Sequence, residues 1–318
     1  MTQGRRTLPP PDPGADFTTL QPDPSRVGGI PESPLVRLPD TSGVFAARAA
    51  RLRTLAEGNP LGEYMQLLAR IADAQHSACA ALPIPPLPPQ EQLAHSAEHA
   101  MPPLTMDQVR GSAEFQAVLS WLLDHAVLDG APLQTASARD ALLEMSTEER
   151  LSLAADVFEG AFPIDRVAEC LFVAAALQVH LAGLAAQLAP LEFKPVADGV
   201  CPVCGGAPVS SLVVGWTQAS KARYCACSLC GSLWNYVRIK CTSCSSTQGI
   251  AYYTIEDGPK SVGVETCTAC RSYIKHMQQH ENPALDPVAD DIGTYGLDVL
   301  ARDQDFRRAG LNPFFIIG

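Results

Sequence analysis

Eight of the 11 cysteines form four Cys-x-x-Cys pairs, and the pairs repeat with a fixed offset. The first two pairs recur 40 residues later, with 22 residues between the pairs of each half and 10 between the halves. Two thiolates on one tight turn occupy one edge of a coordination tetrahedron, and a second turn completes it. We therefore expect two metal ions, one bound by Cys201, Cys204, Cys227 and Cys230 and the other by Cys241, Cys244, Cys267 and Cys270.

The residues that flank these pairs predict how each metal module is built. Each module should contain two metal-binding turns, or knuckles, joined by a β-hairpin. Gly205 and Gly231 follow the second cysteine of each pair in the first module, where glycine accepts a positive φ. Ser245 and Arg271 occupy these places in the second module. We therefore expect strained or altered turns there, and a looser second site.

The remaining cysteines and the other side chains indicate no further chemistry. Cys225 corresponds to Glu265 in the repeat, so we interpret it as a neighbour of the first site rather than a ligand; Cys79 and Cys170 lie on apolar helix faces. The sequence contains no recognisable Ser-His-Asp set, phosphate-binding loop or glycine-rich nucleotide motif. A metal that already has four thiolates offers no open position for a substrate. We therefore expect no catalytic residues and a function that is not enzymatic.

The cysteine usage and the amino-terminal sequence together indicate a cellular compartment. The start of the chain lacks the apolar stretch of a secretory signal, and prolines follow Arg5 and Arg6, which excludes a twin-arginine export signal. We expect a cytoplasmic protein. In the reducing cytoplasm, clustered Cys-x-x-Cys pairs bind metals more often than they form disulfides, which are the alternative.

Charge is unevenly distributed along the 318 residues, which carry a net charge of −11. Residues 201–280 have seven basic and three acidic side chains, for a net +4, whereas residues 281–318 have a net −4. A nucleic-acid footprint requires a stronger basic cluster than this. We therefore expect no nucleic-acid partner.

Composition and periodicity divide the chain into five regions. These are an extended proline-rich arm (1–40), an α-helical domain (41–195), the first Cys₄ module (196–236), the second (237–280), and a tail with a helix (281–318). Residues 165–189 are apolar enough to suggest a membrane span. Glu169 and His180 interrupt this segment, so we expect a buried central helix and no membrane insertion.

Several segments of the chain resemble one known family. They are RYCACSLCGSLW at 223–234, RIKC at 238–241 and ETCTACRSYIK at 265–275, with PLVRLP at 34–39, RAARL at 48–52, ADAQ at 72–75 and NPF at 312–314. Together these segments resemble the formate dehydrogenase accessory protein FdhE family, over nearly the whole length of the chain.

This resemblance implies both a fold and a function. The implied fold is mainly α, a helical amino-terminal domain followed by two tandem rubredoxin-like or zinc-ribbon modules with small β-hairpins. Iron is the favoured metal in both sites, with zinc possible. The implied role is that of a maturation factor for the catalytic subunit of respiratory formate dehydrogenases, which are exported by the twin-arginine route after cofactor loading. We expect the helices and the basic side chains of Arg223, Arg238 and Lys275 to contact this subunit, and a homodimer is possible.

Two other functions are compatible with the cysteine pattern. A zinc-ribbon protein could bind nucleic acid through the basic region 201–280. A rubredoxin-like electron carrier could use an iron site that cycles between two oxidation states, but such a role leaves the large helical domain unexplained. Four thiolates suit both iron and zinc, and the metals could be structural or redox-active.

Overall fold

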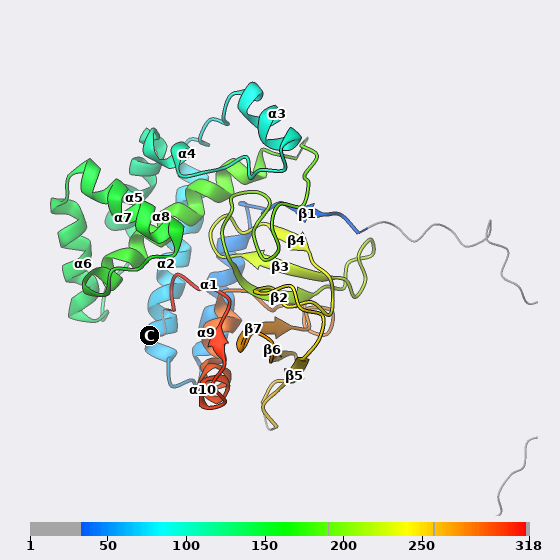
Figure 1. The fold of residues 1–318 in the computed structure, drawn as a ribbon. Helices are drawn as coiled ribbons and strands as arrows, with labels where there is room; N and C mark the ends of the chain where they lie inside the picture. The colour runs from blue at the N-terminus through cyan, green and yellow to red at the C-terminus, as the bar shows by residue number, and fades with distance from the viewer. Residues whose placement is uncertain (1–32, 190, 257, 316–318) are drawn as a thin grey trace, which may run out of the picture. The chain divides into compact units, whose positions relative to one another are not determined.

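The computed structural model describes residues 33–189, 191–256 and 258–315 (Figure 1). Of the proline-rich arm expected over 1–40, residues 1–32 lie outside this described part. The remainder contains the short strand β1 (Val36–Arg37), which pairs antiparallel with a strand of the first metal module, Val36 lying opposite Trp234. The end of the arm is thus part of the sheet.

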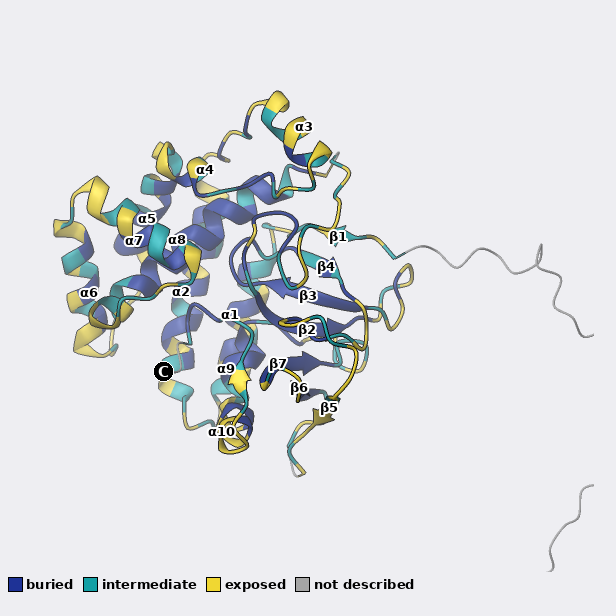
Figure 2. Ribbon diagram, in the orientation of Figure 1, coloured by how far each residue is buried: buried dark blue, intermediate teal, exposed yellow. Residues whose placement is uncertain are grey.

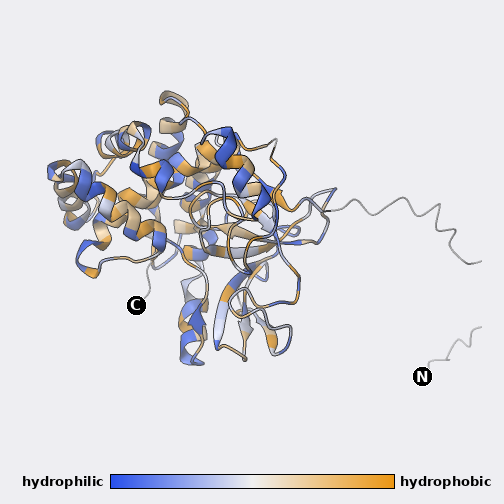
Figure 3. Ribbon diagram, turned by 45° about the horizontal axis from the view of Figure 1, so that its top comes forward, coloured by the Kyte–Doolittle hydropathy of each residue, from blue (hydrophilic) through white to orange (hydrophobic). Residues whose placement is uncertain are grey.

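Helices occupy the chain between residues 44 and 186, within the region 41–195 that the sequence predicts to be helical. Ser146 and Glu149 form a capping box at the start of one of these helices, because the Glu149 amide donates to Ser146 Oγ (3.2 Å) and the Ser146 amide donates to the Glu149 carboxylate (2.8 Å). Most of the helices carry both hydrophilic and hydrophobic residues, which are blue and orange in Figure 3. They are α1 (Val44–Ala56), α2 (Gly62–Ala81), α3 (Gln90–Glu98), α4 (Asp107–Arg110), α5 (Ala113–His125), α6 (Leu133–Glu144), α7 (Thr147–Glu159), the 3₁₀ turn η2 (Ile164–Arg166) and α8 (Val167–Ala186).

Helix α8 is the centre of the helical part. Helices α2, α5, α6 and α7 pack against it, and it is coloured as buried along most of its length in Figure 2. By length and composition Ile164–Ala186 could cross a membrane, and it is the one such helix among the described residues. However, 78% of its most apolar window is buried inside the protein. The predicted buried central helix is therefore confirmed.

The strands of both metal modules belong to one eight-stranded sheet. Along the sheet the order is β1-β4-β3-β2-β7-β6-β5, and β8 pairs with β7. Strands β2 and β7 join the modules by parallel pairing, with Ser211 opposite His276 and Leu212 opposite Met277. The strands are β2 (Pro208–Val213), β3 (Arg223–Cys227), β4 (Leu233–Asn235), β5 (Ile250–Tyr253), β6 (Val262–Cys267), β7 (Ser272–Met277) and β8 (Arg307–Arg308).

This sheet corrects the expected fold class. The prediction of a mainly α protein with small, separate β-hairpins is wrong, because the hairpins of the two modules merge into a continuous mixed sheet beside the helices. Sequence patterns reveal hairpins because their strands are close in the chain. The β2–β7 pairing joins residues 65 positions apart, Ser211 and His276, and has no local signal.

The carboxyl-terminal segment packs back onto both parts of the molecule. The helix expected in the tail (281–318) is two helices, α9 (Ala289–Gly293) and α10 (Tyr295–Asp303), with Thr294 between them. Asn312 and Phe314 are buried, and Tyr64 of α2 donates a hydrogen bond to the Phe314 carbonyl. The chain end is thus packed against α2 as far as residue 315.

The acidic side chains of this segment form buried ion pairs. Asp286 pairs with Arg48 of α1 (3.3 Å) and Asp290 with Arg51 (2.6 Å). The fully buried Lys275 of β7 pairs with Asp298 (2.5 Å), which also contacts the Arg308 guanidinium (2.7 Å). Much of the acidic charge of residues 281–318 therefore lies in ion pairs inside the protein. These pairs hold the segment against α1 and the sheet.

Candidate metal centres

The structure groups the eight thiols into two sets of four. Cys201, Cys204, Cys227 and Cys230 form one set, and Cys241, Cys244, Cys267 and Cys270 form the other. Within each set the four sulfur atoms lie within 4.8 Å of one another. Consecutive Cys-x-x-Cys pairs therefore share a site, as the 40-residue repeat predicts.

The sulfur–sulfur distances fit a tetrahedral metal ion. Cys201 and Cys230 are 3.7 Å apart and Cys204 and Cys227 are 3.4 Å apart; in the second set the corresponding distances are both 3.7 Å. Four sulfurs at about 2.3 Å from a central ion would be about 3.8 Å apart. A disulfide requires about 2.05 Å, so these are free thiols that converge on a point. Each set could hold one metal ion.

The first knuckle of each module has the same backbone hydrogen bonds, offset by 40 residues. The Cys201 amide donates to the Gly206 carbonyl (3.0 Å), and the Cys241 amide donates to the Ser246 carbonyl (2.8 Å). Each turn then closes with a bond from the residue after its second cysteine to the carbonyl of its first cysteine. The first Cys-x-x-Cys segment of each module therefore forms the same tight turn. This turn directs both sulfurs of the pair to one side.

The residue after the second cysteine adopts a left-handed conformation in all four knuckles. Its φ is 77° at Gly205 and 72° at Gly231, compared with 63° at Ser245 and 56° at Arg271. Residues with a Cβ are strained there by about 1–2 kcal/mol each. The second module therefore makes the same turns as the first at a conformational cost, which is one of the two outcomes that the sequence leaves open.

The two sites also differ in their exposure to solvent. All four cysteines of the first site are buried. In the second site Cys244 is exposed and Cys270 half-buried. Burial raises the pKa of Cys201. Burial acts the same way on Cys270, but hydrogen bonds from Ser272 and the neighbouring thiols outweigh it and lower its pKa to about 7.

A serine hydroxyl contacts the last cysteine of each site, and neither serine was identified from the sequence. Ser232 Oγ lies 3.3 Å from the Cys230 sulfur, and Ser272 Oγ lies 3.0 Å from the Cys270 sulfur. Hydrogen bonds of this kind orient a ligand and tune its basicity. The signal was available, because both serines follow the last cysteine of a module by two residues and are themselves 40 positions apart.

The other cysteines lie outside both sets. Cys225 is fully buried on β3, and burial raises its pKa to about 12. Cys170 is buried in α8, and Cys79 is half-buried in α2 with a pKa raised by burial to about 11. A thiol with so high a pKa is a poor nucleophile and a poor ligand at neutral pH. These positions fit the expectation that the three remaining cysteines are not metal ligands.

A buried arginine connects the two modules. Arg223 of β3 is 1% exposed and donates to the Glu265 carboxylate of β6 at 3.0 Å, and Tyr252 donates to the other oxygen of that carboxylate at 2.8 Å. The same guanidinium donates to the carbonyls of Val237, Arg238 and Lys240 in the connection between the modules. Lys275 is likewise 1% exposed. The expectation that Arg223 and Lys275 contact a partner is therefore wrong, because both charges are neutralised inside the protein; Arg238 is exposed.

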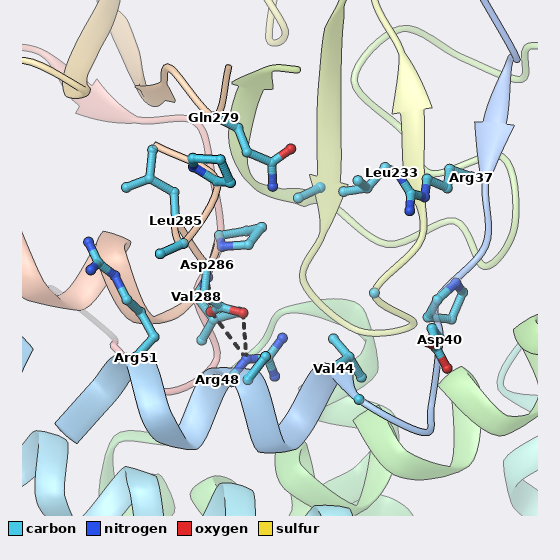
Figure 4. A pocket seen from close by; sticks show the side chains of 18 of the residues that line it. Arg37, Asp40, Val44, Arg48, Arg51, Leu233, Gln279, Leu285, Asp286 and Val288 are labelled. Carbon is cyan, nitrogen blue, oxygen red and sulfur yellow. Dashed lines mark hydrogen bonds and ion pairs between the residues drawn. The ribbon is translucent and has the colours of Figure 1, made fainter. Parts of the chain in front are cut away.

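A cavity of about 920 Å³ lies beside the first site (Figure 4). It is bordered by α1, by the segment after β1 and by the segment that contains Gln279 and Leu285, and Cys227 contributes to its wall. Arg48 crosses toward Asp286 at its edge, and their ion pair is drawn as dashed lines. The charges of α1 along this cavity are thus already paired.

Comparison with known proteins connects this architecture to one family. Models of the FdhE amino-terminal, central and carboxyl-terminal domains match residues 33–198, 200–238 and 239–315. A protein from Rhizobium meliloti (strain 1021) named "Protein FdhE homolog" is 40% identical over 302 residues, covering 93% of this chain and 98% of that protein. A protein of the same name from Edwardsiella ictaluri is 34% identical and covers 92% and 95%.

A solved structure has the same fold. The crystal structure of the FdhE protein from Pseudomonas aeruginosa matches with a TM-score of 0.76 and 30% sequence identity, covering 89% of this chain and 98% of that one. The family models span the helices and both Cys₄ sets, so the likeness is not confined to the metal-binding turns. The chain belongs to the FdhE family.

Proposed function

We propose that this protein is a cytoplasmic accessory factor that binds the catalytic subunit of a respiratory formate dehydrogenase and supports its assembly or activation before export. The observation that carries the proposal is the pair of complete Cys₄ sets within a chain that matches FdhE models from residue 33 to residue 315. Such a chain presents surfaces and bound metals rather than an open reaction centre.

The donor sets support two metal ions, with iron favoured and zinc possible. Four thiolates with sulfur–sulfur distances of 3.4–3.7 Å suit either ion. Bound iron would supply one-electron chemistry, whereas zinc would supply structure alone. The chain holds the sulfurs in place through its knuckle hydrogen bonds and through Ser232 and Ser272. In the second site the exposed Cys244 leaves the metal within reach of a partner.

The arrangement of the remaining polar groups supports a non-enzymatic role. Ser211 and His276 form a hydrogen-bonded pair at 3.0 Å that superficially resembles a nucleophile and its base. Both residues are buried, and burial lowers the pKa of His276 to about 3. Among the described residues no carboxylate contacts the other ring nitrogen of His276, so nothing orients it as a base. The pair serves instead as a polar contact between β2 and β7.

Anaerobic capture of the catalytic subunit tests the proposal. A tagged full-length chain, purified without oxygen from cells that make the dehydrogenase, should retain the catalytic subunit, and cells that lack the chain should produce less active enzyme. Metal analysis with a visible absorption spectrum of the same sample should find two ions per chain. The proposal fails if the subunit is not retained and dehydrogenase activity is unchanged in the cells that lack the chain.

A further inference from the structure

Strand β5 has a free edge. It is the last strand of the sheet, with β6 on one side and no strand on the other among the described residues. The Thr268 amide donates to the Gly249 carbonyl (2.9 Å), and antiparallel pairing alternates from that bond, so Ala251 and Tyr253 direct their peptide groups toward β6. The N–H and C=O groups of Ile250 and Tyr252 therefore point outward, where another strand could pair with them.

This edge has none of the features that usually block strand addition. Edge strands are commonly protected by lysine, proline, a bulge or a covering segment. The sequence of β5 is IAYY, with regular pairing to β6, and its second half is exposed whereas Ile250 and Ala251 are half-buried. Tyr252 and Tyr253 are 45% and 57% exposed, and Ile239 of the neighbouring connection is 56% exposed. The result is an aromatic and aliphatic surface beside unpaired backbone groups.

A small cavity next to β5 is positively charged. It has a volume of about 200 Å³, and its lining includes Arg238, Lys260, Tyr252 and His276 but no carboxylate. His276 is neutral at physiological pH, because burial and the charges of Arg223 and Arg238 lower its pKa to about 3. The side chain of Arg238 is exposed and forms no ion pair with any described residue. The cavity thus carries two cationic groups in a protein whose net charge is −11.

We propose that β5 accepts an extended segment of the formate dehydrogenase catalytic subunit as an added strand, and that an acidic side chain of this segment enters the cavity between Arg238 and Lys260. The inference rests on the proposed function and names the surface that performs it. The outward peptide groups of Ile250 and Tyr252 provide main-chain hydrogen bonds, the tyrosines provide apolar contact, and the two cations select for a carboxylate.

Two other occupants fit the surface less well. A second copy of the chain, paired edge to edge through β5, would bring the cationic cavities of both copies to one interface without an opposing charge. A nucleic acid would satisfy the cations and stack on tyrosines. It has no extended peptide backbone to pair with the outward groups of Ile250 and Tyr252. An acidic extended peptide uses all three features.

Binding measurements with the full chain and the purified catalytic subunit test the inference. Arg238→Glu combined with Lys260→Glu should weaken binding by about tenfold or more and reduce its salt dependence. Arg110→Glu combined with Lys194→Glu reverses two exposed cations in the helical part and is the matched control, expected to change the affinity by less than about twofold. Arg238→Glu alone should still weaken binding clearly. This side chain makes no hydrogen bond within the described residues, so its reversal should leave the fold unchanged.

Two further variants test strand addition itself. Ile250→Pro removes an outward N–H and leaves the bonds to β6 intact, so it should weaken binding while far-UV circular dichroism and the thermal midpoint stay close to those of the unaltered chain. A photo-crosslinking residue at Tyr253 should react with the catalytic subunit. The same residue at Ile164, which is 94% exposed on the helical side, should not react.

The outcomes separate this inference from the proposed function. If the unaltered chain does not bind the subunit, the proposed function fails and this inference fails with it. If it binds and the reversals at Arg238 and Lys260 have no more effect than the control, the inference alone is wrong. It is also wrong if the reversals abolish binding of a single-stranded oligonucleotide instead, or if Ile250→Pro converts a dimer into a monomer without changing subunit binding.

Discussion

The two Cys₄ sites share ligand spacing, turn geometry and a serine contact, yet the parts of the protein that surround them differ. The first site is enclosed by the helical part, since the Leu104 amide donates to the Val203 carbonyl (3.1 Å) and Gln178 of α8 donates to the Ser228 carbonyl (2.8 Å). Both acceptors lie inside its knuckles. The site is therefore part of the core of the molecule.

The second site lies at the periphery. Its contacts come from the linker between α8 and β2, where Asp198 accepts hydrogen bonds from Lys240 and Ser245 (2.6 Å each), and from Phe306, whose ring lies under the Arg271 guanidinium. Its turns require a positive φ from Ser245 and Arg271. We therefore expect burial and backbone strain, rather than the ligands, to set how firmly each site would hold a metal ion. A firmly held first site and an accessible second site fit a structural role for one metal and exposure of the other to a partner.

Ligand removal should reveal the largest difference between the sites. Cys204→Ser should lose the first metal and destabilise the whole chain, because structural metal binding contributes on the order of 10 kcal/mol and this knuckle supports contacts to α8. The matched Cys244→Ser should lose only the second metal and lower the thermal midpoint much less. Metal stoichiometry and calorimetric unfolding check both, and equal losses of stability would contradict the contrast.

Removal of the arginine between the modules should affect both sites together. Arg223→Ala leaves Glu265 buried without its charged partner and three carbonyls without their donor, so we expect a loss of about 3–5 kcal/mol in the free energy of unfolding. Arg238→Ala, at an exposed position, is the control and should cost less than about 0.5 kcal/mol. Denaturant unfolding measures both, and similar values would show that the Arg223–Glu265 pair does not couple the modules.

Metal release should distinguish the sites kinetically. With an excess of chelator, one equivalent of metal should leave at least about tenfold faster than the other, because strain and exposure favour opening of the second site. Stopped-flow detection of the metal–chelator complex gives the two phases. Cys244→Ser should abolish the fast phase and Cys204→Ser the slow phase; a single phase with both equivalents would remove the kinetic distinction.

Substitutions at the positive-φ positions should change the difference in stability between the two sites. Gly205→Ala has room for its Cβ, whose nearest neighbour is 3.6 Å away on Pro102, so its cost of about 1–2 kcal/mol arises from φ alone. Arg271→Gly removes strain but also the contact with Phe306, and we expect a gain below about 1 kcal/mol. Calorimetry compares the two, and a neutral Gly205→Ala would show that left-handed strain does not set site strength.

The smallest effect is expected at the linker carboxylate. Asp198→Asn weakens an ion pair with Lys240 whose side chains are 23% and 42% exposed, so the loss should be below about 1 kcal/mol. It should nevertheless accelerate the fast phase of metal release and leave the slow phase unchanged. Asp165→Asn, in the 3₁₀ turn before α8, is the control and should alter neither phase.

Much of the molecule could be anticipated from local patterns. The grouping of the eight thiols, the burial of α8, the capping box at Ser146 and the strain at Ser245 and Arg271 all follow from spacing, periodicity or backbone chemistry within a few tens of residues. Such patterns are readable because a knuckle or a helix turn forms from neighbours in the chain. The resemblance to FdhE proteins also rests on short local motifs, and comparison with the family confirms it.

Local patterns in the chain thus predict which residues can bind metal, where the helices lie and to which family the chain belongs. Three features become visible in the folded molecule alone: β2 and β7 join the two modules into one sheet, Arg223 and Lys275 are neutralised inside it, and β5 is left as a free edge. These features depend on contacts between segments that are distant in sequence. Whether a cation faces solvent or a buried carboxylate, and whether a strand gains a neighbour, depends on segments many tens of residues away, and no local pattern encodes their meeting.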